Sequence, residues 1–388
     1  MAGARGFSLL EVVIAIGLTL LIVAAVLATV QPSHATFATG PEVADVQQRL
    51  RVAVDTLSRD LTMAGAGAYI GGHTGPLLSY FAPVLPFRQG LSHDDAVGTF
   101  RSDTITVISV PATAAQTTLG ADLMPGALTL QATASPACPA GVNLCGFAAG
   151  MTVAVYDETG NVDLFTIASV ADALAQLTIT VRPADSSTTT YKAGSNVVEV
   201  RVDTYYLKAD AASATFQLMH ADGSANADVP VVDHLVRLAF EYSGEPAPPV
   251  LTSAGSASYG PSPPPLLTQT TAYPPGENCV FQVDAVTGLQ VPRLASLSAT
   301  TALTQLTAAQ LTDGPWCPDA ANANRWDADL LRIRSVSVTI RIEASLDVLR
   351  GPAGVLFTNG GTSRDASKWV ADQEIRVQVS PRNMNLAR

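Results

Sequence analysis

Apolar residues dominate the first thirty positions of the chain. Residues 7–30 read F-S-L-L-E-V-V-I-A-I-G-L-T-L-L-I-V-A-A-V-L-A-T-V, and Glu11 is the one charged side chain among them. At 1.5 Å per residue, this run predicts a helix of about 36 Å, which is enough to cross the roughly 30 Å hydrocarbon core of a bilayer. An ionised acid inside such a helix costs about 2.5–3.5 kcal/mol, so we expect Glu11 to have a partner or a shallow position.

A second helical pattern follows the apolar run. Pro32, between Gln31 and Ser33, predicts a kink or a short break that need not end the helix. Beyond about Pro41, apolar residues recur at spacings of three and four, at Val46, Leu50, Val54, Leu57 and Leu61, with Arg51, Asp55 and Arg59 on the opposite face. We therefore expect residues 31–67 to continue the helix as an amphipathic half that lies against a head and ends near Gly65 and Gly67.

The rest of the chain favours strands and turns, because it is rich in Thr, Ser, Ala, Val, Gly and Pro. Period-two alternation predicts strands in 103–110, 196–207 and 215–220, and a hairpin in 151–170 with Gly160 at its turn. Late strands are expected at about 330–347 and 370–380. We expect one face of this sheet to pack on the helix and the other to meet solvent.

These patterns divide the chain into six segments. Residues 1–6 form a leader, 7–30 a transmembrane helix, 31–67 its amphipathic continuation, 68–242 a β-rich head, 243–278 a loop or linker and 279–388 the C-terminal part of the head. The loop is rich in Pro, Ser and Gly, so we expect it to contribute no packed core, while 294–311 reads as weakly helical. The predicted fold class is α+β, with a long N-terminal helix on a mostly antiparallel sheet that carries large loop insertions.

Four cysteines lie beyond the apolar run, at Cys138, Cys145, Cys279 and Cys317. An even count in a compartment that permits oxidation favours two disulfides, and we expect sequential pairing among the three possible connectivities. Metal binding is the alternative, but neither pair has C-x-x-C spacing and no histidine lies near either pair.

Charge and motifs restrict the chemistry of the head. The net charge is −11 and charged residues make up 14% of the chain, so the basic surface that direct nucleic-acid binding requires is missing. Asp157, Glu158, Asn161 and Asp163 lack the alternation of a calcium loop and read as a solvated turn, and the His93-Asp94-Asp95 cluster has no second histidine at useful spacing. We expect no catalytic residue, no metal site and no cofactor, since no G-x-S-x-G, H-E-x-x-H or P-loop motif occurs.

The N-terminus departs from a secretory signal peptide. The leader Met1–Gly6 has Arg5 as its one basic residue, and the apolar run that follows Gly6 is too long for a signal core. The combination G-F-x-x-x-E resembles a type IV prepilin leader. That resemblance implies that a prepilin peptidase cuts between Gly6 and Phe7, methylates the new amine of Phe7 and leaves the helix in the mature protein. Glu11 would then pair with that amine or with the amine of a neighbouring subunit; the alternative is a plain signal anchor.

Stretches after the apolar run indicate which group of pilins the chain resembles. Gln47–Gly67, which reads Q-Q-R-L-R-V-A-V-D-T-L-S-R-D-L-T-M-A-G-A-G, resembles the segment that follows the first helix in minor pilins of the PilW kind. Looser likenesses to the same family lie in Val231–Tyr242, which resembles a strand that enters a turn, in Leu330–Ala344, which resembles a late strand, and in Val377–Asn383 near the end.

The resemblance implies a function. The chain would be a minor pilin that enters the inner membrane by a single helix, holds its head in the periplasm, and joins a fibre at the cell surface. Its partners would be the prepilin peptidase, other minor and major pilins and the pilus assembly platform, with which it would prime or cap fibre assembly. Two alternatives stay open: a minor pseudopilin of type II secretion, and a membrane-anchored binding module or hydrolase.

Overall fold

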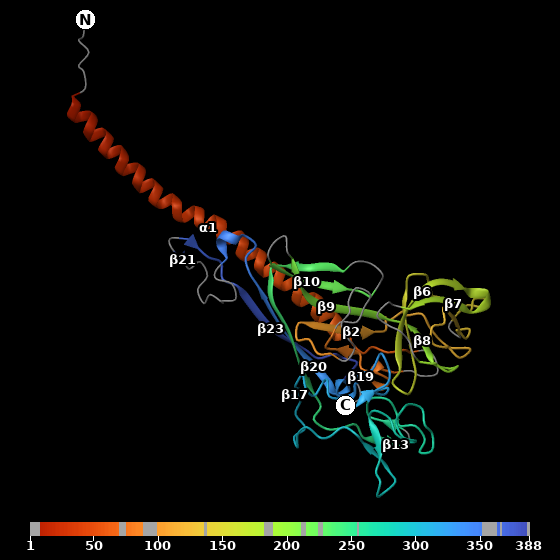
Figure 1. Ribbon diagram of the computed structural model, residues 1–388. Coiled ribbons are helices and arrows are strands. Elements are labelled where there is room, and N and C mark those ends of the chain that lie inside the picture. The colour runs from red at the N-terminus through yellow and green to blue at the C-terminus, as the bar shows by residue number, and fades with distance from the viewer. Residues whose placement is uncertain are drawn as a thin grey trace. The chain divides into compact units, whose positions relative to one another are not determined.

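The computed structural model describes residues 8–69, 75–87, 99–135, 138–181, 189–210, 215–223, 228–253, 256–350, 363–364 and 367–385 (Figure 1). The chain divides into two compact units, which we describe separately. One comprises Met1–Leu50 and Ile342–Glu374, and the other comprises Arg51–Arg341 and Ile375–Arg388. Gly6, Phe7 and the His93-Asp94-Asp95 cluster lie outside the described residues.

One helix, α1, runs from Leu9 to Met63. Of the kink or short break predicted at Pro32, the break is wrong, because the backbone is helical on both sides of this residue and through it; the helix continues past Pro32, as the prediction allowed. A proline removes one backbone hydrogen bond, and the flanking turns are enough to continue the helix here. The apolar half and the amphipathic half are therefore parts of a single element.

The amphipathic half of α1 has the predicted faces. Ala53, Leu57 and Leu61 are at most 1% exposed, while Arg51 and Asp55 lie on the exposed side. The helix ends as expected, because Gly65 follows it with a φ of 79°, in the left-handed region that favours glycine. The Gly65 N–H donates to the Ile108 carbonyl at 2.9 Å, which fastens the end of the helix to the adjoining strand.

A five-stranded antiparallel sheet in the second unit has the order β1-β2-β9-β10-β11. Its strands are β1 (Val84–Leu85), β2 (Thr104–Ser109), β9 (Arg201–Asp210), β10 (Thr215–Ala221) and β11 (Val229–Asp233). The predicted alternation of buried and exposed positions is wrong for β2, in which all six residues are buried. Both faces of this inner strand are covered, and Thr104 and Thr106 share the interior with the apolar residues.

A six-stranded sheet has the order β3-β8-β5-β6-β7-β4. Its strands are β3 (Gln116–Thr118), β4 (Thr129–Gln131), β5 (Thr152–Tyr156), β6 (Val162–Ala171), β7 (Gln176–Val181) and β8 (Asn196–Glu199). β5 and β6 form the predicted hairpin, with Gly160 at a φ of 93° in its turn. All six strands lie in sequence between β2 and β9, which are themselves paired from Thr104↔Tyr206 to Ser109↔Arg201.

The C-terminal strands build a four-stranded sheet with the order β17-β12-β20-β23. Its strands are β12 (Leu235–Gly244), β17 (Thr304–Leu306), β20 (Ile333–Ile342) and β23 (Gln373–Val379). The stretch predicted as one strand at 231–242 is divided between β11 and β12 by His234, whose φ is 55°. The helix expected in 294–311 is wrong, because this stretch contains β17 and turns, and Thr304 and Gln305 pair with β12.

Short elements complete the described chain. Four two-stranded ladders pair β13 (Leu251–Ser253) with β14 (Ser256–Ala257), β15 (Phe281–Val283) with β16 (Gln290–Pro292), β18 (Trp316–Cys317) with β19 (Trp326–Asp327), and β21 (Ser363–Arg364) with β22 (Ser367–Lys368). Four 3-10 turns span Leu77–Ser79, Asp172–Leu174, Ala328–Arg332 and Asp347–Leu349.

In the first unit, Val43 of α1 packs against Ala344, Leu349 and Val370. Glu42 accepts hydrogen bonds from the backbone N–H and the hydroxyl of Ser345, each at 2.9 Å. The apolar contacts and the hydrogen bonds to Glu42 together hold the segment after β20 on α1.

The proline-rich segment 243–278 is built into the second unit, so the expectation that it contributes no packed core is wrong. Tyr259 is 4% exposed and Asn278 is 1% exposed. The Asn278 amide donates to the Pro261 and Ser262 carbonyls at 2.9 and 3.0 Å, and its oxygen accepts from two following backbone N–H groups. Side-chain bonds thus satisfy a backbone that prolines leave without sheet partners.

Both predicted disulfides are present in the sequential pairing. Cys138 pairs with Cys145 and Cys279 pairs with Cys317, with Cα–Cα distances of 5.4 and 5.1 Å. Disulfides persist in oxidising compartments, so together with the apolar N-terminal helix they indicate an extracytoplasmic, membrane-associated protein.

The two disulfides are expected to differ in their contribution to stability. They close sequence separations of 7 and 38 residues. Loop-closure entropy predicts a loss of about 2 kcal/mol from the free energy of unfolding when Cys138 and Cys145 are both replaced by alanine, and about 4 kcal/mol for Cys279 and Cys317. Urea unfolding of the two double variants measures this difference, and equal losses would contradict the loop-length explanation.

Candidate functional site

The first half of α1 is apolar and is not buried by the rest of the protein. Leu9–Ala28 has a mean hydropathy of 2.8 and none of it is buried, so its length and composition suit a membrane span or a signal segment. Leu9, Leu10 and Leu21 are each more than two-thirds exposed. This surface needs either lipid or the same surface of other chains to cover it.

Glu11 caps the start of this helix. The backbone N–H of Ser8 donates to Glu11 Oε2 at 2.9 Å, and the backbone N–H of Glu11 donates to Ser8 Oγ at 3.2 Å. These reciprocal bonds form a capping box, in which a serine and a glutamate three residues later satisfy free N–H groups of the first turn. The sequence contains the S-x-x-E signature of this box in Ser8 and Glu11.

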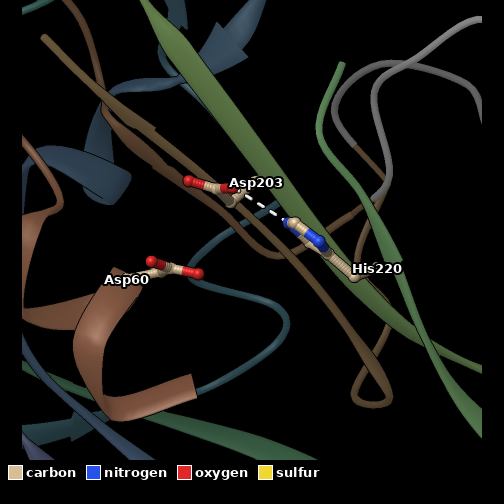
Figure 2. A group of neighbouring side chains, drawn as sticks. All are labelled: Asp60, Asp203 and His220. Atoms are coloured by element: carbon tan, nitrogen blue, oxygen red, sulfur yellow. Dashed lines mark hydrogen bonds and ion pairs between the residues drawn. The ribbon is translucent and has the colours of Figure 1, made fainter. Parts of the chain in front are cut away.

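A cluster of charged and aromatic side chains joins the end of α1 to the five-stranded sheet (Figure 2). Arg201, Asp203 and Tyr205 alternate along β9 and therefore share one face, and His220 of β10 is the register partner of Tyr205. The last turn of α1 brings Asp60 to this face. Five residues from three elements thus meet in one place.

Asp203 lies at the centre of this cluster. Its Oδ1 is 2.9 Å from His220 Nε2 and 3.1 Å from Arg201 Nη2, and the same guanidinium nitrogen is 3.6 Å from Asp60 Oδ1. The side chains of Asp60 and Asp203 are 8% and 3% exposed, whereas that of Arg201 is 54% exposed. Asp203 raises the pKa of Arg201, which is the expected direction for a cation beside buried carboxylates.

Tyr205 orients the other members of the cluster. Its hydroxyl donates to Asp60 Oδ2, and its ring stacks on that of His220 with 4.7 Å between the centroids and 17° between the planes. Burial raises the pKa of Tyr205, and its bond to Asp60 raises it further. The phenol therefore stays protonated and keeps its donor on Asp60.

The acidic hairpin turn differs from its predicted solvated state. Asn161 and Asp163 are 9% and 4% exposed. The Tyr191 hydroxyl donates to Asp163 at 2.9 Å, and the Asn324 amide donates to the other oxygen of this carboxylate. The turn is a buried polar network because a second segment, around Asn324, covers it, and a local sequence pattern does not reveal such a partner.

A second acidic group comprises Asp313, Asp327 and Asp329. Asp327 accepts backbone N–H groups of Gly314 and Asp329 at 2.7 and 2.8 Å, and Asp329 is paired with Arg332. Burial raises the pKa of Asp327 from its ordinary value near 4 to about 7, against the opposing effect of the two backbone bonds. This carboxyl group is therefore expected to titrate in the neutral range.

The raised pKa of Asp327 predicts a pH-dependent stability. Between about pH 4 and pH 7 the folded chain holds a proton that the unfolded chain has lost, so the free energy of unfolding falls by up to about 1.4 kcal/mol per pH unit as pH rises. Asp327→Asn is expected to remove this slope, at a constant cost of about 1 kcal/mol for one lost acceptor. Urea unfolding at several pH values tests the prediction, and an unchanged slope in the variant would contradict it.

No known protein-family model matches the chain, and no curated protein sequence matches it.

Proposed function

We propose that this protein is a minor pilin of the PilW kind, which enters the inner membrane and helps to prime or cap a type IV pilus. The observation that carries the proposal is the single helix from Leu9 to Met63. Its first 20 residues are an unburied apolar span, and its last turns are packed in an antiparallel β-sheet unit that holds two disulfides. A helix with both properties suits a subunit that moves from a bilayer into a fibre core.

In this proposal Glu11 acts after processing. Cleavage between Gly6 and Phe7 creates an ammonium group close in sequence to Ser8 and Glu11. Inside a packed bundle of apolar helices, the low dielectric strengthens an ion pair between Glu11 and such an amine, its own or that of a neighbouring subunit. Glu11 would then fix the axial register of each subunit, in addition to capping its helix.

The decisive experiment is an intact-mass and N-terminal analysis of the membrane-extracted protein, produced with and without a prepilin peptidase. Loss of residues 1–6 together with a methyl group on Phe7, in the presence of the peptidase alone, is the expected result. An uncut chain under both conditions would reject the proposal and favour a signal-anchored surface protein.

A minor pseudopilin of type II secretion is the main alternative. The type IV pilus and the type II secretion system use subunits with the same leader and helix, so these features do not separate them. Deletion of the gene does, because the two systems have different products. Loss of surface fibres with intact secretion supports a pilus subunit, whereas loss of secretion with intact fibres supports a pseudopilin.

A membrane-anchored binding module is the second alternative, and a cavity of about 570 Å³ in the head favours it. Its lining includes Tyr80, Glu158, Pro263, Pro264 and Pro265. Its volume is in the range of small-molecule sites. Ligand binding by the head is also compatible with a fibre subunit, so the cavity alone does not argue against the pilin proposal.

A further inference from the structure

We propose that Asp60, Asp203 and His220 bind a divalent transition-metal ion, Zn²⁺ by its ligand chemistry, which cross-links the end of α1 to strands β9 and β10. The ligand atoms, one from each side chain, lie within 4.8 Å of one another. One imidazole nitrogen and two carboxylate oxygens form a set that zinc accepts in proteins, and the imidazole favours zinc over calcium or magnesium.

The guanidinium group of Arg201 lies close to both carboxylates of the proposed site. Arg201 Nη2 lies 3.1 Å from Asp203 Oδ1 and 3.6 Å from Asp60 Oδ1. A single guanidinium nitrogen serves both carboxylates, so neither has the paired bonds of a bidentate contact. Arg201 therefore balances one of the two negative charges through a single nitrogen, and a divalent ion in its place would balance both.

The charge of the cluster also favours a divalent ion. Asp60 lies in the last turn of α1, where the helix dipole is negative and disfavours a carboxylate. Two buried carboxylates and this dipole face one arginine, so the site retains negative charge when His220 is neutral. Replacing Arg201 by a divalent cation would balance the two acids completely.

The surroundings allow both exchange and coordination. The Arg201 side chain is 54% exposed, so it can turn into solvent and free both carboxylates. The two acids are 8% and 3% exposed and are held by the helix and the sheet. Tyr205 orients two of the ligands, because its hydroxyl donates to Asp60 and its ring stacks on His220.

The test uses the full chain in detergent, stripped of metal by a chelator, and titrated with Zn²⁺ by calorimetry while thermal unfolding is followed. We expect one zinc per chain and a higher midpoint of unfolding with zinc. His220→Ala and Asp203→Asn are expected to weaken binding at least about 100-fold, while Asp327→Asn in the other acidic group leaves it unchanged.

The zinc affinity of Arg201→Ala separates a metal site from a cluster that only stabilises the fold. If the arginine competes with the ion, this variant unfolds at a lower temperature without zinc but binds zinc about tenfold more tightly, and its zinc-dependent rise in midpoint is larger. The proposal is overturned if the wild-type chain binds no zinc at about 100 μM, if His220→Ala binds normally, or if Arg201→Ala binds more weakly than wild type.

Discussion

Glu11→Ala is expected to reduce the number of assembled fibres at least about tenfold, while peptidase processing and membrane insertion stay normal. The reason is the proposed ion pair with a processed Phe7 amine, which in a packed helix core contributes more than the roughly 1.4 kcal/mol that corresponds to a factor of ten. Fibre counts by electron microscopy, with immunoblots of the membrane fraction, measure the effect.

Two matched variants separate charge from helix capping. Glu11→Gln keeps the side-chain acceptor that completes the capping box with Ser8 but removes the charge, and Ser8→Ala removes the hydroxyl but keeps the charge. We expect Glu11→Gln to be as defective as Glu11→Ala and Ser8→Ala to assemble fibres nearly normally. Normal fibre numbers in Glu11→Gln would show that the carboxylate acts only as a cap.

Arg332→Ala is expected to lower the free energy of unfolding by about 3–5 kcal/mol. Arg332 is fully buried, pairs with Asp329, and donates to the Pro246 and Ala247 carbonyls at 3.1 and 3.2 Å. Removing it leaves a buried carboxylate without its cation and several carbonyls without a donor. Urea unfolding of the purified chain measures the loss.

An exposed arginine provides the control. Arg376 pairs with Glu241, and the two side chains are 63% and 40% exposed, so Arg376→Ala is expected to cost at most about 1 kcal/mol. The double substitution Arg332→Met with Asp329→Leu is expected to recover much of the loss, because it leaves no buried charge unpaired. Similar losses for Arg332→Ala and Arg376→Ala would contradict the role given to burial.

The parts of the fold that the sequence predicted correctly depend on local patterns. The stripe through Leu57 and Leu61 specifies a helix face whatever it packs against, and Gly160 specifies a tight turn between two alternating runs. Four cysteines allow only three pairings, and the pairing of neighbours in the sequence is confirmed. The helix stripe, the turn glycine and the Cys138–Cys145 pair each lie within one short stretch of chain, and the second disulfide follows once the first pair is assigned.

The parts that could not be predicted depend on distant partners. Asp60 interrupts the apolar face of α1, and this acid in an apolar stripe indicates a buried polar contact. Its partner could not be predicted, because Tyr205, whose hydroxyl donates to Asp60, lies 145 residues away. The composition of the proline-rich segment is typical of a linker, and it does not reveal that the Asn278 amide donates to carbonyls at positions 261 and 262. The division of 231–242 at His234 could not be predicted either, because no local pattern signals that this histidine has a φ of 55°.

The placement of the six-stranded sheet has a consequence for the size of the head. Ser109 and Arg201 are register partners on neighbouring strands, so residues 110–200 leave and re-enter the five-stranded sheet at the same point, as an enlarged hairpin loop would. Lengthening such a loop from a few residues to this size costs only about 2–3 kcal/mol of closure entropy, and the excursion has its own apolar core around Val153, Phe165 and Val197 to offset it. The closure of the five-stranded sheet therefore sets little limit on the size of this excursion, while bonds such as that from Asn324 to Asp163 hold its β5–β6 hairpin to the rest of the head.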